Sequence, residues 1–304
     1  VEMSGPAGEA CPYSSLYHLV VVPTAVARSE RHTMQNALRL ASVKASVYLA
    51  ETALGVPAAA TEIFECSGPD DSARDGIPRI AYIGQIHSRQ RVAEVDEQIL
   101  YGANTAGMVP VILHPNEWID GALVTSHSSM GVETYFYQNS PIISELYRWH
   151  REGRIILVGT IATMAASDNG DRARNAMLAA RQAQWNLAAN GVILTKYGGG
   201  APHADMSLTA RLCEELGMQT TVQVSDMSRD RRAESALLFN YPEVDAIVYV
   251  GGNDTRWAVP ALERVVGGSP GATEALGKSQ ELDASRVCGV VSQQGASKLR
   301  AFVT

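Results

Sequence analysis

Two short stretches decide the fold: Arg154-Ile155-Ile156-Leu157-Val158-Gly159-Thr160-Ile161 and, further along, Val192-Ile193-Leu194-Thr195-Lys196. Each is a run of aliphatic and β-branched residues, which is typical of a buried strand. The Ala-rich segment Asp171–Asn190 between them has the length of a helix, and Gly191 follows it as a stop signal. A strand, a helix and a second strand in this order predict a parallel sheet with crossover helices.

The same alternation extends in both directions along the chain. We expect further strands at Leu19–Val22, Thr61–Cys66, Arg79–Ile86, Met108–His114, Gln219–Val224, Ala246–Val250 and Arg286–Val291. We expect further helices at Glu30–Leu54, Val92–Tyr101, Pro141–His150 and Met206–Leu216. A charge-rich stretch at Arg148–Arg154 suggests a boundary. We therefore predict an α/β protein with two Rossmann-like lobes, residues 1–147 and 148–304, each with a parallel sheet in a three-layer αβα arrangement.

Composition excludes two classes of protein. The 304 residues carry a formal charge of −7 and include no basic run, which argues against a nucleic-acid-binding protein. No apolar stretch reaches the length of a membrane span, and the segment that begins at Val1 lacks the basic and apolar regions of a signal peptide. The four cysteines are far apart, as expected for reduced thiols, so we predict a cytoplasmic protein.

Neither a metal nor a nucleotide is expected. His203 and Asp205 are two possible metal ligands, but no third ligand is fixed by spacing. The glycines at 198–200 and 251–252 follow predicted strands, yet they form neither a G-x-G-x-x-G motif nor a phosphate-binding loop. Tight turns explain them, although a nucleotide-dependent enzyme stays open as a rival interpretation.

The most unusual stretch is residues 120–131, where an apolar run leads into Ser126-His127-Ser128-Ser129. It lacks the G-x-S-x-G context of a hydrolase nucleophile. A Ser-rich loop is one interpretation. A second is self-cleavage, in which a serine hydroxyl attacks the preceding carbonyl and forms an ester. Elimination of the ester then gives dehydroalanine, which hydrolyses to a pyruvoyl group. The stretch does not decide between them by itself.

Matches to one known family run along nearly the whole chain. They are Met3-Ser4-Gly5-Pro6 through Cys11-Pro12-Tyr13-Ser14, Leu19–Pro23, Ala81-Tyr82-Ile83, Pro110, Pro115-Asn116-Glu117, Asp120-Gly121-Ala122, Asn139–Ile143, Leu146-Tyr147, Gly191–Thr195, Pro202 with Asp205, and Pro260-Ala261-Leu262. The chain resembles the pyruvoyl-precursor subunits of component B of glycine, sarcosine and betaine reductases, and more distantly the D-proline reductase proprotein. The resemblance also implies a segment upstream of Val1.

The chemistry implied by this resemblance needs a partner. The family's proprotein cleaves itself before a cysteine, which becomes a pyruvoyl group. That carbonyl condenses with the substrate amine and weakens the carbon–nitrogen bond. A selenol or thiol on a partner subunit then displaces the nitrogen. The resemblance thus implies a hetero-oligomer, a small amine-containing substrate, and a thiol- or selenol-bearing component B-like partner.

One position departs from the family pattern. Counting forward from Asp120-Gly121-Ala122, the family's cysteine falls on Ser128 and its preceding asparagine on His127. Serine can also give a pyruvoyl group, so we take Ser128 as the precursor. Ser129 is an alternative, and His127 and Asp120 are catalytic candidates beside it. The substitution leaves a second interpretation open, namely an uncleaved substrate-binding or scaffold subunit.

Residues at strand ends and in the matched stretches are the candidates for substrate binding. They are Cys11, His87, Glu117, Thr195, Lys196, Asp205 and Asn253. Each has a structural alternative. Cys11 can be a buried thiol, Glu117 a helix cap, and Lys196 an exposed lysine at a strand end.

Overall fold

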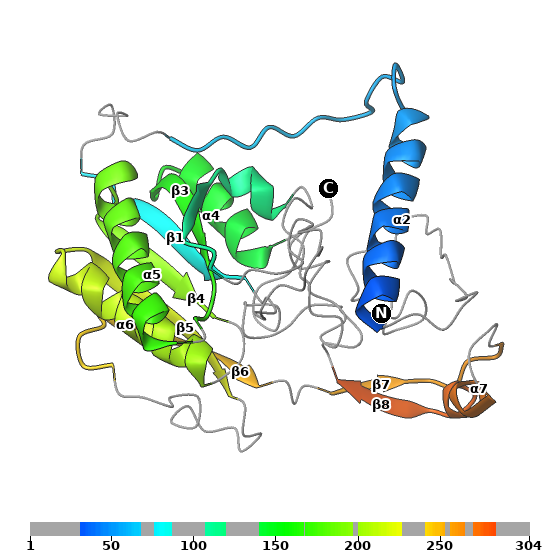
Figure 1. Ribbon diagram of the computed structural model, residues 1–304. Helices are drawn as coiled ribbons and strands as arrows, with labels where there is room; N and C mark the ends of the chain where they lie inside the picture. The colour runs from blue at the N-terminus through cyan, green and yellow to red at the C-terminus, as the bar shows by residue number, and fades with distance from the viewer. Residues whose placement is uncertain are drawn as a thin grey trace. The chain divides into compact units, whose positions relative to one another are not determined.

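The computed structural model describes residues 31–67, 76–86, 107–119, 140–166, 168–196, 200–226, 241–252, 256–264 and 270–283. The chain divides into two compact units. One comprises residues 1–14 and 64–303, and the other comprises residues 15–63 with residue 304. Figure 1 shows the described elements in colour.

In the smaller unit, the described residues form one long helix, α2 (Arg31–Glu51), followed by a turn. Gly55 takes a φ of +81° after that turn, a conformation that favours glycine. The predicted helix Glu30–Leu54 is thereby confirmed, and it ends three residues earlier than expected.

In the larger unit, six strands form one mixed sheet in the order β2-β3-β1-β4-β5-β6. The strands are β1 (Arg79–Gln85), β2 (Val111–Leu113), β3 (Ile156–Thr163), β4 (Gly191–Thr195), β5 (Gln219–Asp226) and β6 (Ala246–Gly252). All pair in parallel except β2, which is an antiparallel edge strand beside β3. The α/β class is confirmed.

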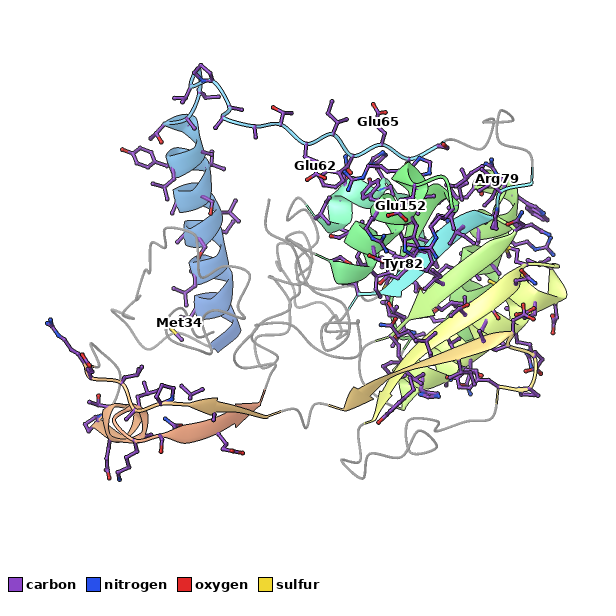
Figure 2. All side chains as sticks on the ribbon, turned by 180° about the vertical axis from the view of Figure 1, so that it is seen from behind. Met34, Glu62, Glu65, Arg79, Tyr82 and Glu152 are labelled. Carbon is purple, nitrogen blue, oxygen red and sulfur yellow. The ribbon has the colours of Figure 1, made fainter. Side chains whose placement is uncertain are left out.

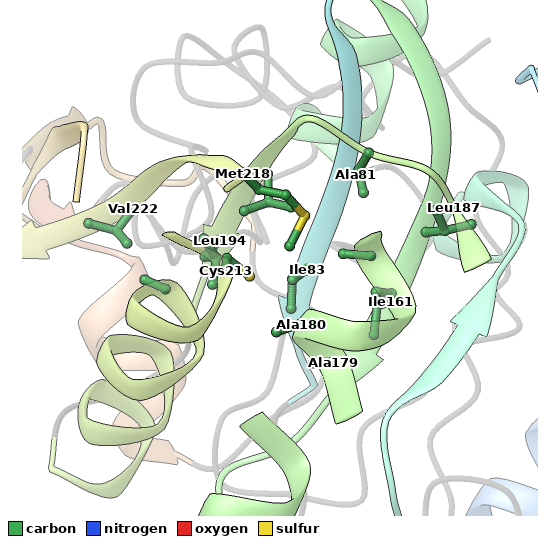
Figure 3. Packing of buried hydrophobic residues seen from close by; sticks show 14 of the residues in the cluster. Ala81, Ile83, Ile161, Ala179, Ala180, Leu187, Leu194, Cys213, Met218 and Val222 are labelled. Carbon is green, nitrogen blue, oxygen red and sulfur yellow. The ribbon is translucent and has the colours of Figure 1, made fainter. Parts of the chain in front are cut away.

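Helices cover both faces of the sheet. On one face, α5 (Asn169–Arg181), a π-helical turn η3 (Gln182–Asn186) and α6 (Ala201–Glu215) pack on β1, β3, β4 and β5 through a cluster that includes Ile83, Leu194 and Met206. Figure 3 shows this cluster from close by. On the other face, α4 (Pro141–Arg151) and the short helix η2 (Pro115–Trp118) pack through Tyr82 and Trp118. The described part is therefore a three-layer arrangement.

A smaller element pair lies further along the chain. β7 (Arg256–Val259) and β8 (Gln280–Asp283) form an antiparallel pair, and α7 (Pro270–Leu276) lies between them in sequence.

The strand pairing crosses the boundary that we predicted between two lobes. β1 and β2 come from residues 1–147 and the other four strands from residues 148–304, yet all six share one sheet. β1, from the first predicted lobe, pairs on both sides with strands of the second, β3 and β4. The described strands of the two predicted lobes therefore do not form separate sheets. The division of the chain at residue 147 stays a prediction.

One predicted strand is wrong, and three predicted elements cannot be compared. Thr61–Cys66 forms no strand; Phe64 and Cys66 instead pack as side chains against the α4 cluster, while Ile63 is 69% exposed. Leu19–Val22, Val92–Tyr101 and Arg286–Val291 lie outside the described residues.

We predict that Gly84→Ala destabilises the sheet. A Cβ at Gly84 would lie 2.5 Å from Cη2 of Trp118, whose indole is fully buried and donates a 2.7 Å hydrogen bond to Thr160 Oγ1. The ring therefore has no room to retreat, and overpacking of this kind costs about 1–3 kcal/mol. Urea unfolding measures the loss. Gly271→Ala is the control, because nothing lies within 4 Å of its added methyl, and an equal effect at both sites would contradict the prediction.

Candidate functional site

The strand order creates a point where the chain changes direction across the sheet. From β1 the chain runs to the edge strand β2 and then to β3, both on one side of β1, and from β3 it crosses over to β4 on the other side. In sheets of this kind, ligands bind beyond the carboxyl ends of the strands at such a switch point. In this protein it lies between β1 and β4, which pair in parallel.

Three polar side chains stand in a row across the carboxyl ends of β3, β1 and β4. Gln85 pairs with Thr163, and the pairing of Gly84 with Thr195 places Lys196 beside Gln85 one residue later. Side chains alternate along a strand, so all three project to the α5/α6 face. All are buried, with Gln85 4% and Lys196 1% exposed.

Only the nitrogen of the Gln85 side-chain amide makes a hydrogen bond within the described residues. Its Nε2 donates a 2.9 Å hydrogen bond to the carbonyl of Pro202, in the first turn of α6. That carbonyl can only accept, so the orientation of the amide is fixed. The Oε1 atom is buried and accepts no hydrogen bond within the described part of the chain. Gln85 therefore presents a buried acceptor at the switch point.

Two basic groups next to Gln85 have altered proton affinities. Burial lowers the pKa of Lys196 to about 8. Burial, with a contribution from the charge of Lys196, lowers the pKa of His203 to about 4, so this imidazole is neutral at pH 7. The His203 ring lies 5.2 Å from the ring of Tyr241, whose buried hydroxyl makes no hydrogen bond in the described residues. We call Thr163, Gln85, Lys196, His203 and Tyr241 the switch-point cluster.

Asp205, a predicted substrate ligand, joins α6 to α5. One of its oxygens accepts a 2.5 Å hydrogen bond from the Ala166 amide, and the other is paired with Arg172 of α5. Burial raises the pKa of this carboxyl, against the opposing effects of both partners. The described contacts of Asp205 are thus structural, and they fix the first turns of α6 relative to α5.

Thr195 and Lys196 are neighbours in sequence but face opposite sides of the sheet. The Thr195 hydroxyl lies 2.7 Å from the Tyr82 hydroxyl on the α4 face, where Tyr82 also meets Trp118 edge-on. Figure 2 labels Tyr82 and Arg79, both on β1. The structure therefore brings Lys196, but not Thr195, into the cluster with Gln85.

Glu117 lies on η2, on the α4 face of the sheet. Its neighbours in sequence form a second polar group there. His114 Nε2 is 3.3 Å from Cys66 Sγ, and Asn116 accepts a 2.5 Å hydrogen bond from Tyr147. Glu117 thus lies on the face opposite to Gln85 and Lys196.

The remaining predicted site residues lie outside the described part of the chain. They are Cys11, His87, Asp120, His127, Ser128, Ser129 and Asn253. Their roles stay predictions.

Sequence reasoning missed Gln85, Thr163 and Tyr241 as site residues. Gln85 sits at the end of an apolar strand, where a polar residue after six largely apolar ones is a usable signal. Tyr241 carries no such signal. Its position beside His203 is known from the structure and follows from no local sequence pattern.

Within the described residues, no three histidine, cysteine or acidic side chains converge as a metal site. Of the helices that the structure describes, none is both long enough and apolar enough to cross a bilayer.

Comparison with known families assigns the chain as a whole. Residues 1–296 match the glycine/sarcosine/betaine reductase component B subunits. The chain belongs to this family. No solved structure matches it.

Three relatives within the component B family show how far the similarity extends. The glycine reductase complex component B subunits alpha and beta of Acetoanaerobium sticklandii are 24% identical over 318 residues, covering 99% of this chain and 73% of the relative. The sarcosine reductase complex component B subunit alpha of Peptoclostridium acidaminophilum is 25% identical, covering 88% and 62%. The betaine reductase complex component B subunit alpha of that organism is 24% identical, covering 94% and 68%.

We predict that Lys196→Met stabilises this component B subunit at pH 7. A pKa lowered from 10.5 to about 8 corresponds to roughly 3 kcal/mol of lost stability, at about 1.4 kcal/mol per pKa unit. The loss is complete below pH 8, and it disappears as the pH rises toward 10.5, because the unfolded chain then loses its proton as well. Urea unfolding of both proteins across this range measures the difference, and a difference independent of pH would contradict the prediction.

We predict that Asp205 and Arg172 are energetically coupled. A double-mutant cycle with Asp205→Ala and Arg172→Ala should give a coupling of about 1–3 kcal/mol in urea unfolding, because the pair is largely buried. The exposed pair Arg211 and Glu215 is the control and should couple by less than about 0.5 kcal/mol. Equal coupling in the two pairs would rule out a clamp between α5 and α6.

Proposed function

We propose that the protein is a substrate-binding subunit of a glycine/betaine-reductase-like complex. It would hold a small amine-containing substrate for reductive carbon–nitrogen cleavage by a thiol- or selenol-bearing component B-like partner in the cytoplasm. The match of residues 1–296 to the component B family carries this proposal. The relatives are named as glycine, sarcosine and betaine reductase components, which supports a small amino acid or its N-methyl derivative as substrate.

The reactive group in this proposal comes from Ser128. Its hydroxyl attacks the carbonyl of His127 and the peptide bond becomes an ester. Elimination then releases the carboxylate of His127 and leaves dehydroalanine at residue 128, which water hydrolyses to a pyruvoyl group with loss of ammonia. The carbonyl of that group can condense with an amine and withdraw electrons from the carbon–nitrogen bond. The residue chemistry fits, because a serine hydroxyl is a competent nucleophile for this rearrangement.

In this proposal, the described residues hold and orient the substrate. A small polar molecule must be held out of water and oriented, and buried polar side chains at a switch point are suited to both. Gln85 and Lys196 provide a fixed acceptor and a cation there. Asp205 and Arg172 hold the adjoining helices in place.

A second function within the same family is an uncleaved scaffold subunit. The observation that favours it is the serine at residue 128, where the family pattern has a cysteine, the better nucleophile. In this role the protein would present substrate to its partner without a pyruvoyl group.

Processing at Ser128 separates the two functions. Denaturing mass spectrometry of active protein should show fragments of residues 1–127 and 128–304, and borohydride with substrate should leave an adduct on residue 128. Ser128→Ala should prevent cleavage and lower complex activity by roughly a hundredfold or more, as expected when a covalent group is lost. Ser129→Ala is the matched control. An intact chain in fully active protein would reject the pyruvoyl proposal and favour the scaffold.

A further inference from the structure

Cys66 and His114 form a thiol–imidazole pair on the α4 face of the sheet. His114 Nε2 lies 3.3 Å from Cys66 Sγ, although 48 residues separate the two in sequence. Cys66 is a free, half-buried cysteine, and His114 is exposed. A small molecule can therefore approach this pair from the solvent. Cys213 on α6 offers no such access, because it is 0% exposed.

The position of the proton on the imidazole is fixed by the other ring nitrogen. His114 caps the short helix η2, and its Nδ1 accepts a 3.2 Å hydrogen bond from the backbone N–H of Asn116. A nitrogen that accepts carries no proton, so in the neutral ring the proton is on Nε2. Nε2 therefore donates its N–H to the sulfur of Cys66.

This tautomer is unsuited to two common roles of a cysteine–histidine pair. A general base that takes the proton of the thiol needs a lone pair on the nitrogen facing the sulfur, and so does a metal ligand. The nitrogen of His114 that faces Cys66 has an N–H in place of that lone pair. An N–H stabilises negative charge on the sulfur, and the thiolate is the form of cysteine that attacks a disulfide.

Further contacts hold the two side chains in place. Asn116 Nδ2 donates a 3.3 Å hydrogen bond to the carbonyl of Phe64, two residues before Cys66. Asn116 Oδ1 accepts a 2.5 Å hydrogen bond from the hydroxyl of Tyr147 on α4. One side chain thus connects the segment that carries Cys66, the helix η2 and the helix α4. The distance between sulfur and imidazole is set by this framework as well as by the pair itself.

Burial and the imidazole act on the thiol in opposite directions. Partial burial raises the pKa of Cys66, so the thiolate is a minor form at neutral pH. Burial first, and then the charge of Cys66, raises the pKa of Tyr147, which stays a neutral hydroxyl. Arg151 of α4 lies over the Phe64 ring, 5.6 Å from its centroid. The N–H of His114 is the printed contact that favours the thiolate, so the reactivity of Cys66 depends on it.

We propose that Cys66 is a modification site, at which the thiol forms a mixed disulfide with a small disulfide molecule while His114 Nε2–H stabilises the attacking sulfur. The thiol first releases its proton to water, and the thiolate then attacks one sulfur of the small molecule. A new sulfur–sulfur bond forms, the original one breaks, and the departing thiolate takes up a proton. The small disulfide is the oxidant, and half of it leaves as a reduced thiol.

This site goes beyond the proposed function. It lies on the face of the sheet opposite to Gln85, and its chemistry involves neither a pyruvoyl group nor residue 128. In a cytoplasm that keeps thiols reduced, the adduct would form when small disulfides accumulate and would be removed when thiols return. The modification would thus report the thiol–disulfide balance around the protein.

Oxidised glutathione tests the proposal on the folded full-length chain. After free thiols are blocked, peptide mass spectrometry should find the mixed disulfide on Cys66 at least roughly tenfold faster than on Cys213, and dithiothreitol should remove it. Cys213 is the internal control, because burial raises its pKa to about 12. A chain in which Cys66 stays unmodified, or reacts no faster than Cys213, would overturn the assignment.

Two variants test the role of His114. His114→Ala should raise the midpoint of the pH–rate curve by about one unit and slow the reaction at pH 7 by roughly threefold, because a more basic thiolate is scarcer but more nucleophilic. His114→Gln keeps an N–H donor and should react nearly as fast as the unaltered chain. Urea unfolding verifies that both variants fold. An unchanged midpoint in His114→Ala, or equal slowing in both variants, would overturn the role of the N–H.

The pH profile of the unaltered chain tests the tautomer. If Nε2 carries the proton, the rate should fall steadily as the pH is lowered from about 9 to about 5, because only the ionisation of the thiol supplies thiolate. An imidazole that takes the proton of the thiol would form an ion pair, and such cysteines stay reactive at about pH 5. A rate that is maintained at that pH would overturn the assignment of His114 as a donor.

Discussion

The parallel pairing of β1 with β4 is the constraint on which the rest of the structure depends. It places Gln85 beside Lys196 and fixes which residues of these strands face α5 and α6. A shift of one residue in this register would turn Gln85 to the α4 face and bring Tyr82 into the cluster of aliphatic residues. The close fit of Gly84 under Trp118 opposes such a shift, because only glycine leaves room for the indole there.

Burying this row of polar groups costs stability, and the surrounding packing offsets the cost. Lys196 and His203 both have pKa values lowered by burial, which means that the fold holds each of them in an environment unfavourable to its charged form. Natural folds keep such groups where the chemistry of a site needs them. The compensation comes from the aliphatic cluster beneath the row, which contains Ile83, Leu194 and Val222 (Figure 3).

The sequence was sufficient for the class of fold and for most elements, because local hydrophobic patterns carry that information. Strands β1, β3 and β4 and helix α4 lie within a few residues of where periodicity places them. Pattern alone could not show that β1 joins strands from the second half in one sheet, since pairing is a long-range property. The same limit applies to the site. Lys196 was predictable from its place after a strand, and Gln85 carries a similar signal at the end of β1, but only the register shows that the two residues lie on adjacent strands.

The first turn of α6 connects the stability of the fold to the site. It is held from one side by Gln85, which donates to the Pro202 carbonyl, and from another by Asp205, which accepts from Ala166 and pairs with Arg172. Both contacts are made within the protein itself, so they fix the position of this turn beside Gln85 and Lys196. The negative charge of Asp205 is balanced by Arg172. Among the side chains of the switch-point cluster, Lys196 is charged at neutral pH, whereas the buried imidazole of His203 is neutral there.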